Sequence, residues 1–183
     1  IPKGLVGSEM CIRDRINPAN EEVLGQASKA SPEDVNKALL SAQKGLEVWK
    51  KTPPWQRAYV LRRIADKMRE KQDILAKWMT LEVGKPFAEA KGEVNGAADI
   101  YEWNAEETKR IYGQTVESRF EDTRVHVYYQ PVGVVAALVP WNFPLVLSAR
   151  KISTALAAGC SVIVKPDVIT VSYTHLRAHE TLR

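Results

Sequence analysis

The sequence predicts an α/β fold in which helices come first and a strand, a helix and a second strand follow. Between residues 31 and 111, apolar residues recur at the spacing of amphipathic helices. Residues 132–139 then form a continuous apolar block rich in valine, which is typical of a strand covered on both faces. Residues 144–158 return to helical spacing, and residues 161–164 form a second short apolar block. This order predicts a βαβ unit with a parallel pair of strands.

The composition indicates one globular unit, or part of a larger one, and argues against several classes of protein. With 183 residues, 45% hydrophobic and 26% charged, the chain can bury a core and does not resemble a disordered segment. The net charge of +4 comes from interleaved acidic and basic residues, which does not indicate a nucleic-acid binder. No apolar run reaches the length of a membrane span. Cys11 and Cys160 offer neither a disulfide framework nor a metal site, so we expect a cytoplasmic protein.

The two ends of the chain are antisense images of each other at the level of codons. If the codon for Gly4 is GGT, its reverse complement is ACC, a codon for threonine, and threonine is the residue at position 181. The same correspondence continues codon by codon, without a gap, through both ends. Identical adapter DNA joined to both ends of a fragment produces such an image, and the sequence resembles a transposase-type sequencing adapter read as protein. We therefore interpret residues 1–14 and 171–183 as adapter-derived artefacts and residues 15–170 as the biological segment.

Four helices are expected before the strands of the βαβ unit. The first begins after Ser31, a good N-cap followed by proline, with Asp34 at the capping-box spacing. Its apolar positions predict a stripe that must be buried, formed by Val35, Ala38, Leu39, Ala42, Leu46 and Trp49. A second helix follows the prolines at 53–54, a third spans 72–83, and a fourth runs over about 86–111. We expect their aromatic side chains in the core rather than in a cofactor site.

Two stretches outside the helical region have the features of strands. Residues 16–25 predict an edge strand with a turn at 18–21. Residues 124–130 alternate between apolar and polar side chains, which predicts a strand with one wet face and, with its surroundings, a β-hairpin before the βαβ unit. His126 lies on the polar face without an acidic or nucleophilic neighbour in the sequence. We therefore interpret it as an exposed strand residue rather than a catalytic one.

Polar side chains gather at the carboxyl ends of the two predicted parallel strands. Asn142 follows the first strand between two prolines, Lys151 lies on the helix after it, and Lys165 ends the second strand. Each residue has an ordinary alternative: Asn142 as a turn residue, and the lysines as solvated surface residues. Ligands of open α/β sheets bind where strand carboxyl ends meet. The three residues together therefore predict a site for an anionic or carbonyl ligand.

Several blocks of the sequence together resemble the N-terminal part of the NAD(P)-dependent aldehyde dehydrogenase superfamily. The most specific is Pro-Trp-Asn-Phe-Pro at 140–144 with a downstream Lys-Pro at 165–166. Other blocks match in the same order: Asn-Pro-Ala at 17–19, Leu-Glu-Val-Gly-Lys-Pro at 81–86, Glu-Ala-Lys-Gly-Glu at 89–93, Ala-Glu-Glu-Thr-Lys-Arg-Ile-Tyr-Gly at 105–113, Arg-Lys at 150–151 and Ala-Ala-Gly-Cys at 157–160. The upstream blocks lean toward the succinate-semialdehyde dehydrogenase group. The resemblance covers residues 16–170 and implies a truncated Rossmann-like cofactor domain.

The resemblance implies a small-molecule aldehyde substrate, NAD or NADP as cofactor, and a homo-oligomeric parent protein without nucleic-acid or membrane partners. In the chemistry of this family a cysteine thiolate attacks the aldehyde, hydride leaves to the nicotinamide, and a glutamate-activated water hydrolyses the thioester. Asn142 corresponds to the side-chain donor to the oxyanion, and Lys151 to a lysine associated with proton relay. The corresponding cofactor contacts are Val139, Pro140, Trp141, Asn142 and Lys165, the last to the adenosine ribose. No metal is implied.

The same resemblance also indicates what this segment lacks. The nucleophilic cysteine, the glutamate base and the glycine-rich phosphate turn are expected beyond Thr170, so the segment alone is expected to be inactive. Cys160 follows a helix end, where a small buried residue is expected, and is not that nucleophile. The family often has a ribose-binding glutamate where Val168 stands, so NAD and NADP both remain open, with Asp167 as a neighbouring substitute. The alternative function is a non-catalytic scaffold or interaction module of the same fold.

Overall fold

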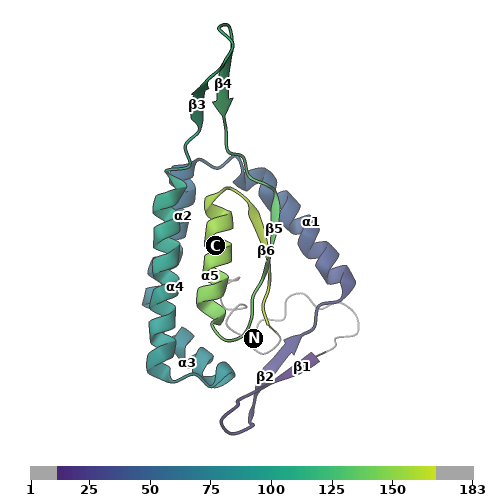
Figure 1. The fold of residues 1–183 in the computed structure, drawn as a ribbon. Coiled ribbons are helices and arrows are strands. Elements are labelled where there is room, and N and C mark those ends of the chain that lie inside the picture. The colour runs from purple at the N-terminus through teal and green to yellow at the C-terminus, as the bar shows by residue number, and fades with distance from the viewer. Residues whose placement is uncertain (1–11, 168–183) are drawn as a thin grey trace.

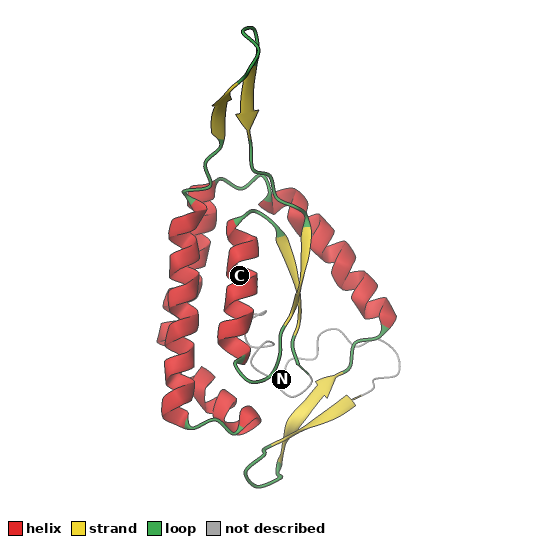
Figure 2. Cartoon of the chain, viewed as in Figure 1, coloured by secondary structure: helices red, strands yellow, loops and turns green. Residues whose placement is uncertain are grey.

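The computed structural model describes residues 12–167. Its helices are α1 (Pro32–Trp49), α2 (Pro54–Glu70), α3 (Gln72–Val83), α4 (Phe87–Thr108) and α5 (Pro144–Ala157). Its strands are β1 (Ile12–Ile16), β2 (Val23–Ser28), β3 (Gln114–Glu117), β4 (Arg124–Val127), β5 (Val134–Leu138) and β6 (Ser161–Lys165). Figures 1 and 2 show α2 and α4 on one side of α5, the β5–β6 pair on its other side, and α1 beyond these strands. The α/β fold class is confirmed.

Helix α1 begins as predicted but does not bury its apolar stripe. The Asp34 N–H donates to the Ser31 hydroxyl oxygen at 3.2 Å, and the Ser31 N–H donates to the Asp34 carboxylate at 3.1 Å, which completes the capping box. These bonds from Ser31, the backbone bond foremost, lower the pKa of Asp34. The expectation of a buried stripe is wrong, because α1 has no buried residue and Val35 and Leu39 are 56% and 40% exposed. The helix packs mainly on β5 and β6, and two strands are too narrow to cover it.

The core lies between α2, α3, α4 and α5. Helix α4 is central to it, and its buried apolar residues are Ala90, Val94, Ala97, Ala98, Tyr101 and Ala105. Of the aromatic side chains of α4 expected in the core, Tyr101 is buried, whereas Phe87 and Trp103 are 44% and 68% exposed, so this expectation holds only in part. Leu61 of α2, Met79 of α3 and Leu145 of α5 pack in the same core. The small side chains of α4 let its neighbours approach closely, so α5 has a well-defined position against α4.

Strand β5, helix α5 and strand β6 form the predicted βαβ unit. The two strands are parallel, with Val134 opposite Ser161 and Leu138 opposite Lys165. The expectation that the strands are covered on both faces is wrong, because Leu138 is 62% exposed and Ala137 is the buried residue of β5. Within the described residues this sheet is two strands wide, so α1 and α5 cover only part of it. The carboxyl ends of both strands open at the same end of the pair, as predicted.

The turn after α5 requires glycine at position 159. Gly159 has a φ of 87°, and a Cβ atom there would lie 2.1 Å from Arg57 Nη1 and 2.9 Å from Pro131 Cγ. Because Arg57 is itself buried, at 8% exposure, its guanidinium has little room to move away. The adjacent Cys160 is also buried, as expected.

We expect Gly159→Ala to destabilise the intact protein by about 1–3 kcal/mol, through overpacking and left-handed backbone strain. Gly92→Ala is the matched control, because a Cβ atom there meets nothing within 4 Å and alanine favours a helix by roughly 1 kcal/mol over glycine. Thermal unfolding of the two variants checks the prediction. Equal midpoints for Gly159→Ala and Gly92→Ala would contradict it.

A β-hairpin forms from β3 and β4, as predicted, and projects away from the helices (Figure 1). The expectation that one face of this strand pair is covered is wrong. All residues of β3 are exposed, and Val125 of β4 is 42% exposed, because the hairpin extends beyond the ends of the helices. His126 is exposed, as expected, and its Nδ1 atom lies 3.2 Å from the Thr115 hydroxyl oxygen.

A second hairpin joins β1 to β2. The Asn17 N–H donates to the Glu22 carbonyl at 2.9 Å, which closes the turn where the sequence predicts one. Strand β1 begins at Ile12, inside the end interpreted as adapter-derived, and its pairing with β2 uses backbone groups that any sequence supplies. Residues 1–11 and 168–183 lie outside the described residues, so the second end and Val168 are not placed.

Candidate active site

A short exposed loop connects β5 to α5 at the carboxyl end of the strands. In this loop Trp141 and Phe143 are 48% and 50% exposed, and Asn142 between them is also exposed. Phe143 has a φ of −134° and a ψ of 67°, since a residue before proline is kept out of the helical region. Helix α5 therefore starts abruptly at the buried Pro144, as predicted, and anchors one end of the loop.

The side-chain amide of Asn142 makes no hydrogen bond to the residues that the structure describes. Its backbone carbonyl, in contrast, accepts a hydrogen bond from Lys85 Nζ at 3.1 Å. An asparagine that serves a turn commonly bonds the backbone nearby, as Asn17 does when its side chain accepts from the Ala19 N–H at 3.0 Å. Within the described residues Asn142 makes no such bond, and the residue is exposed.

Both candidate lysines lie beside the end of β5, Lys151 through its side chain and Lys165 through its backbone. Lys151 Nζ donates to the Leu138 carbonyl and ties α5 to the strand end. Leu138 lies opposite Lys165, whose backbone carbonyl accepts from the Val139 N–H at 3.1 Å. The backbone carbonyl of Asn142 is instead hydrogen-bonded to a residue between α3 and α4, and that residue was not among the predicted site residues.

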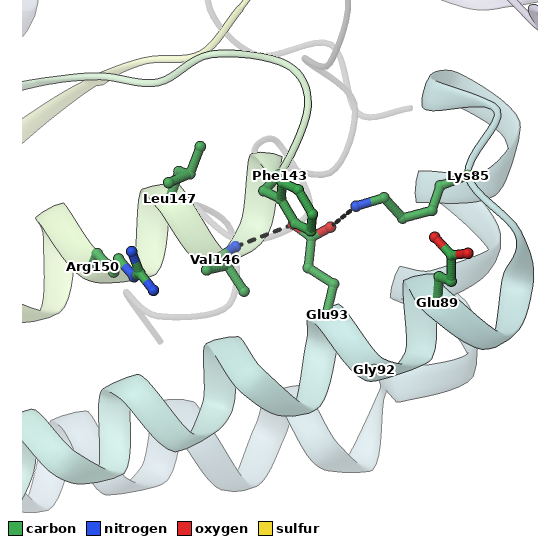
Figure 3. Close-up of a pocket in the computed structure, with 8 residues that line it drawn as sticks. All are labelled: Lys85, Glu89, Gly92, Glu93, Phe143, Val146, Leu147 and Arg150. Carbon is green, nitrogen blue, oxygen red and sulfur yellow. Dashed lines mark hydrogen bonds and ion pairs between the residues drawn. The ribbon is translucent and has the colours of Figure 1, made fainter.

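That residue is Lys85, which forms a buried ion pair with Glu93. The side chains of Lys85 and Glu93 are 10% and 2% exposed. Glu93 Oε1 accepts from the backbone N–H groups of Leu145 at 2.9 Å and Val146 at 3.2 Å. Figure 3 shows the bond to Val146. Lys85 Nζ also lies 3.8 Å from the centre of the Phe143 ring. The sequence contained a signal for this pair, because a glutamate among the alanines of a buried helix face needs a partner.

A pocket of about 540 Å³ opens between α4 and α5 beside this ion pair. Its lining residues are Lys85, Glu89, Gly92, Glu93, Phe143, Val146, Leu147 and Arg150. Figure 3 shows Arg150 at one end of the pocket and Glu89 near Lys85 at the other. Arg150 is exposed and forms no ion pair with a residue in the described range. An aromatic, an aliphatic and a cationic side chain border this space at helical spacing. They are Phe143 at the N-cap of α5, and Leu147 and Arg150 on the helix itself.

Residues that could contact a dinucleotide lie beside the loop, at the strand ends. Pro140, Trp141 and Lys165 are exposed at the carboxyl ends of two parallel strands, where such ligands bind in open α/β sheets. Val139 is 5% exposed and its N–H is bonded within the sheet, so it retains only a carbonyl oxygen for a ligand. Between residues 12 and 167, no group of His, Cys, Asp or Glu side chains could hold a metal ion, and no helix is long and apolar enough to cross a membrane.

Comparison with known proteins gives consistent matches. The sequence model of the aldehyde dehydrogenase family matches residues 7–181 of the chain. The chain is 47% identical over 153 residues to succinate-semialdehyde dehydrogenase [NADP(+)] of Escherichia coli (strain K12), covering 84% of this chain and 32% of that protein. It is 47% identical over 150 residues to glutarate-semialdehyde dehydrogenase of Pseudomonas aeruginosa, covering 82% and 31%.

A crystal structure of an E. coli NADP-dependent enzyme superposes on the chain with a TM-score of 0.92 at 44% identity, over 94% of this chain and 36% of that chain. The chain thus spans about a third of the length of the proteins it matches. The resemblance found in the sequence is confirmed, because the family's sequence model covers nearly the whole chain and the fold matches at this identity. The chain belongs to the aldehyde dehydrogenase family.

Proposed function

We propose that the protein to which this chain belongs oxidises an aldehyde bearing a remote anionic group to the carboxylic acid, with NAD⁺ or NADP⁺ as oxidant. Succinate semialdehyde is the substrate that we infer first. The observation that carries this proposal is the pocket between α4 and α5, which is lined by Phe143 of the loop and, two turns along α5, by Arg150. The chain by itself is expected to be inactive, because the family's nucleophilic cysteine and glutamate base correspond to positions beyond Thr170.

Asn142 is the proposed donor to the oxyanion. When a thiolate attacks an aldehyde, the carbonyl oxygen becomes an oxyanion, and a donor already in place stabilises it without reorganisation. A neutral amide suits this role when its backbone is held by Lys85 and its side chain is unbonded within the described residues. Lys151 is the proposed proton-relay residue, with its ammonium held at the strand end by the Leu138 carbonyl.

A nicotinamide dinucleotide, when bound, supplies the acceptor for the hydride. Pro140, Trp141 and the Val139 carbonyl are the proposed contacts at the end of β5, and Lys165 is the proposed contact to the ribose. The exposure of Pro140, Trp141 and Lys165 at the strand ends supports this assignment. The E. coli relative is named for NADP(+), and the proposal includes both NAD⁺ and NADP⁺.

Arg150 supports the choice of an aldehyde with a remote anion. The two relatives are named for semialdehydes of succinate and glutarate, molecules with a carboxylate at the end opposite the aldehyde. Arg150 lies two helical turns after Phe143, roughly 10 Å along α5, a length that an arginine side chain and a short semialdehyde together span. A guanidinium binds a carboxylate through two parallel hydrogen bonds. Glu89, an acidic residue of the pocket lining, lies toward the other end (Figure 3).

The test is aldehyde oxidation by the full-length protein that carries this segment. We expect reduction of NAD⁺ or NADP⁺ with succinate semialdehyde, at a kcat/KM about 10-fold or more above that for butyraldehyde, which lacks the charge. Steady-state assays with both cofactors measure this preference. If neither cofactor is reduced with any aldehyde, the proposed function is wrong.

The gene downstream of Thr170 distinguishes this enzyme from a non-catalytic scaffold of the same fold. We expect the source DNA, read past the segment interpreted as adapter, to encode the family's cysteine and glutamate. A continuous reading frame without these two residues would favour the scaffold instead.

A further inference from the structure

We propose that Lys85 and Glu93 are positioning residues that hold the Asn142 loop and the first turn of α5 in the geometry that oxyanion stabilisation needs. The proposal rests on the function proposed above, because it assigns both residues to the same site. They act through the backbone of the loop and of α5 and not on the reacting atoms.

Helix α5 begins without a cap of its own. Phe143 at the N-cap position forms no side-chain hydrogen bond, Pro144 has no N–H, and the first turn contains no acidic residue. Glu93 of α4 supplies the missing acceptor, since one of its oxygens binds the N–H groups of both Leu145 and Val146. A carboxylate at this position is also favoured by the helix dipole. The start of α5 is therefore fixed to α4 and not to its own flanking residues.

Lys85 connects this cap to the loop. Its ammonium pairs with Glu93, donates to the Asn142 carbonyl oxygen at 3.1 Å, and lies 3.8 Å from the centre of the Phe143 ring. The face of an aromatic ring attracts a cation, so the ring and the preceding carbonyl are held by the same group. Because both charged side chains are buried, salt screens this pair much less than it screens a surface pair.

Binding the Asn142 carbonyl restrains the peptide plane between Asn142 and Phe143. The direction in which the Asn142 side chain leaves the backbone depends on that plane, and so does the placement of its amide. A displacement of about 1 Å at a reacting centre can cost on the order of 10²-fold in rate. Removing the Lys85 ammonium should therefore lower kcat even though Asn142 remains present.

The experiment compares steady-state kinetics of the full-length protein carrying Lys85→Met, Glu93→Gln or the control Lys91→Met. Lys91 also lies on α4 and pairs with an acidic residue, Asp73, at 2.7 Å, but this pair is exposed and does not contact the loop. We expect both test variants to lower kcat by about 10-fold to 100-fold, with KM for NAD(P)⁺ within about two-fold of wild type. Lys85→Arg, which keeps the charge and the donor, should restore part of kcat, and Lys91→Met should match wild type.

A double-mutant cycle separates positioning from a general structural role. If Lys85 acts through Asn142, Lys85→Met should change kcat by less than about two-fold when Asn142 is already alanine. Additive effects in the cycle would overturn the proposal. It would also be overturned if Lys85→Met only lowered the unfolding temperature and left kcat per folded molecule unchanged.

Amide hydrogen exchange over residues 141–147 provides a readout that does not depend on activity. We expect faster exchange in Lys85→Met and Glu93→Gln than in wild type and in Lys91→Met, because the loop and the first turn of α5 lose their restraint. Unchanged exchange would overturn the positioning role. An inactive wild-type protein would instead overturn the proposed function, and exchange would still show whether this ion pair holds the loop.

Discussion

Asn142→Ala in the full-length protein should lower kcat for the proposed aldehyde oxidation by about 10²-fold to 10³-fold and leave the Kd for NAD(P)⁺ within about two-fold. The variant removes the amide proposed as oxyanion donor but keeps the backbone carbonyl that Lys85 binds. Transition-state stabilisation is therefore lost while the loop is still held. Steady-state kinetics give kcat, and a fluorescence titration gives the cofactor Kd. If cofactor affinity falls and kcat holds, Asn142 serves only as a turn residue.

Asn20→Ala is the matched control for this experiment. Asn20 is also an exposed turn asparagine, and its side chain accepts from the Glu22 N–H at 3.2 Å in the β1–β2 turn. It belongs to the β1–β2 hairpin and not to the β5–α5 loop, so we expect wild-type kcat. Equal losses of activity in the two variants would indicate general damage rather than a lost oxyanion donor.

Arg150→Met should lower kcat/KM for succinate semialdehyde by roughly 10-fold to 100-fold, because a charge-assisted hydrogen bond to the carboxylate is lost. For butyraldehyde, which has no carboxylate, kcat/KM should stay within about two-fold of wild type. Steady-state assays with both aldehydes measure the change in preference. Methionine keeps much of the apolar length of arginine, so the pocket wall remains filled.

Two further variants complete this test. Arg150→Lys should restore part of the activity toward the semialdehyde, because it keeps the charge but not the planar fork. Arg124→Met removes another exposed arginine, on the projecting β3–β4 hairpin, and should leave both aldehydes unaffected. An equal loss of kcat/KM with both aldehydes in Arg150→Met would show that Arg150 does not recognise the anion.

Element boundaries were predictable where they depend on a few neighbouring residues. Helix α3 spans Gln72–Val83 as predicted, because Gly84 adopts the left-handed conformation that ends it, with a φ of 74°. The start of α1 follows from Ser31 and its capping box. The start of α5 follows from Pro144, which suits the first helical position.

Burial was less predictable, because it depends on what else packs against a surface. The apolar spacing of α1 predicts that one face of the helix packs against other elements. How much of that face is buried depends on the width of the sheet, which is two strands in the described residues. The same reason explains the exposed Leu138 of β5. The hairpin strand β4 alternates in sequence yet has neither face covered, because the hairpin projects from the helices.

At the candidate site, the chain sequence alone establishes where the loop lies and which polar group it presents. Two prolines stop β5, start α5 and leave Asn142 between them, and these effects act within a few residues. The partners of the loop come from packing: Lys85 lies 57 residues from Asn142, and Glu93 lies 52 residues from Leu145. No local rule links positions so distant. They meet because the alanine-lined face of α4 brings α5 close enough for a buried carboxylate to cap it.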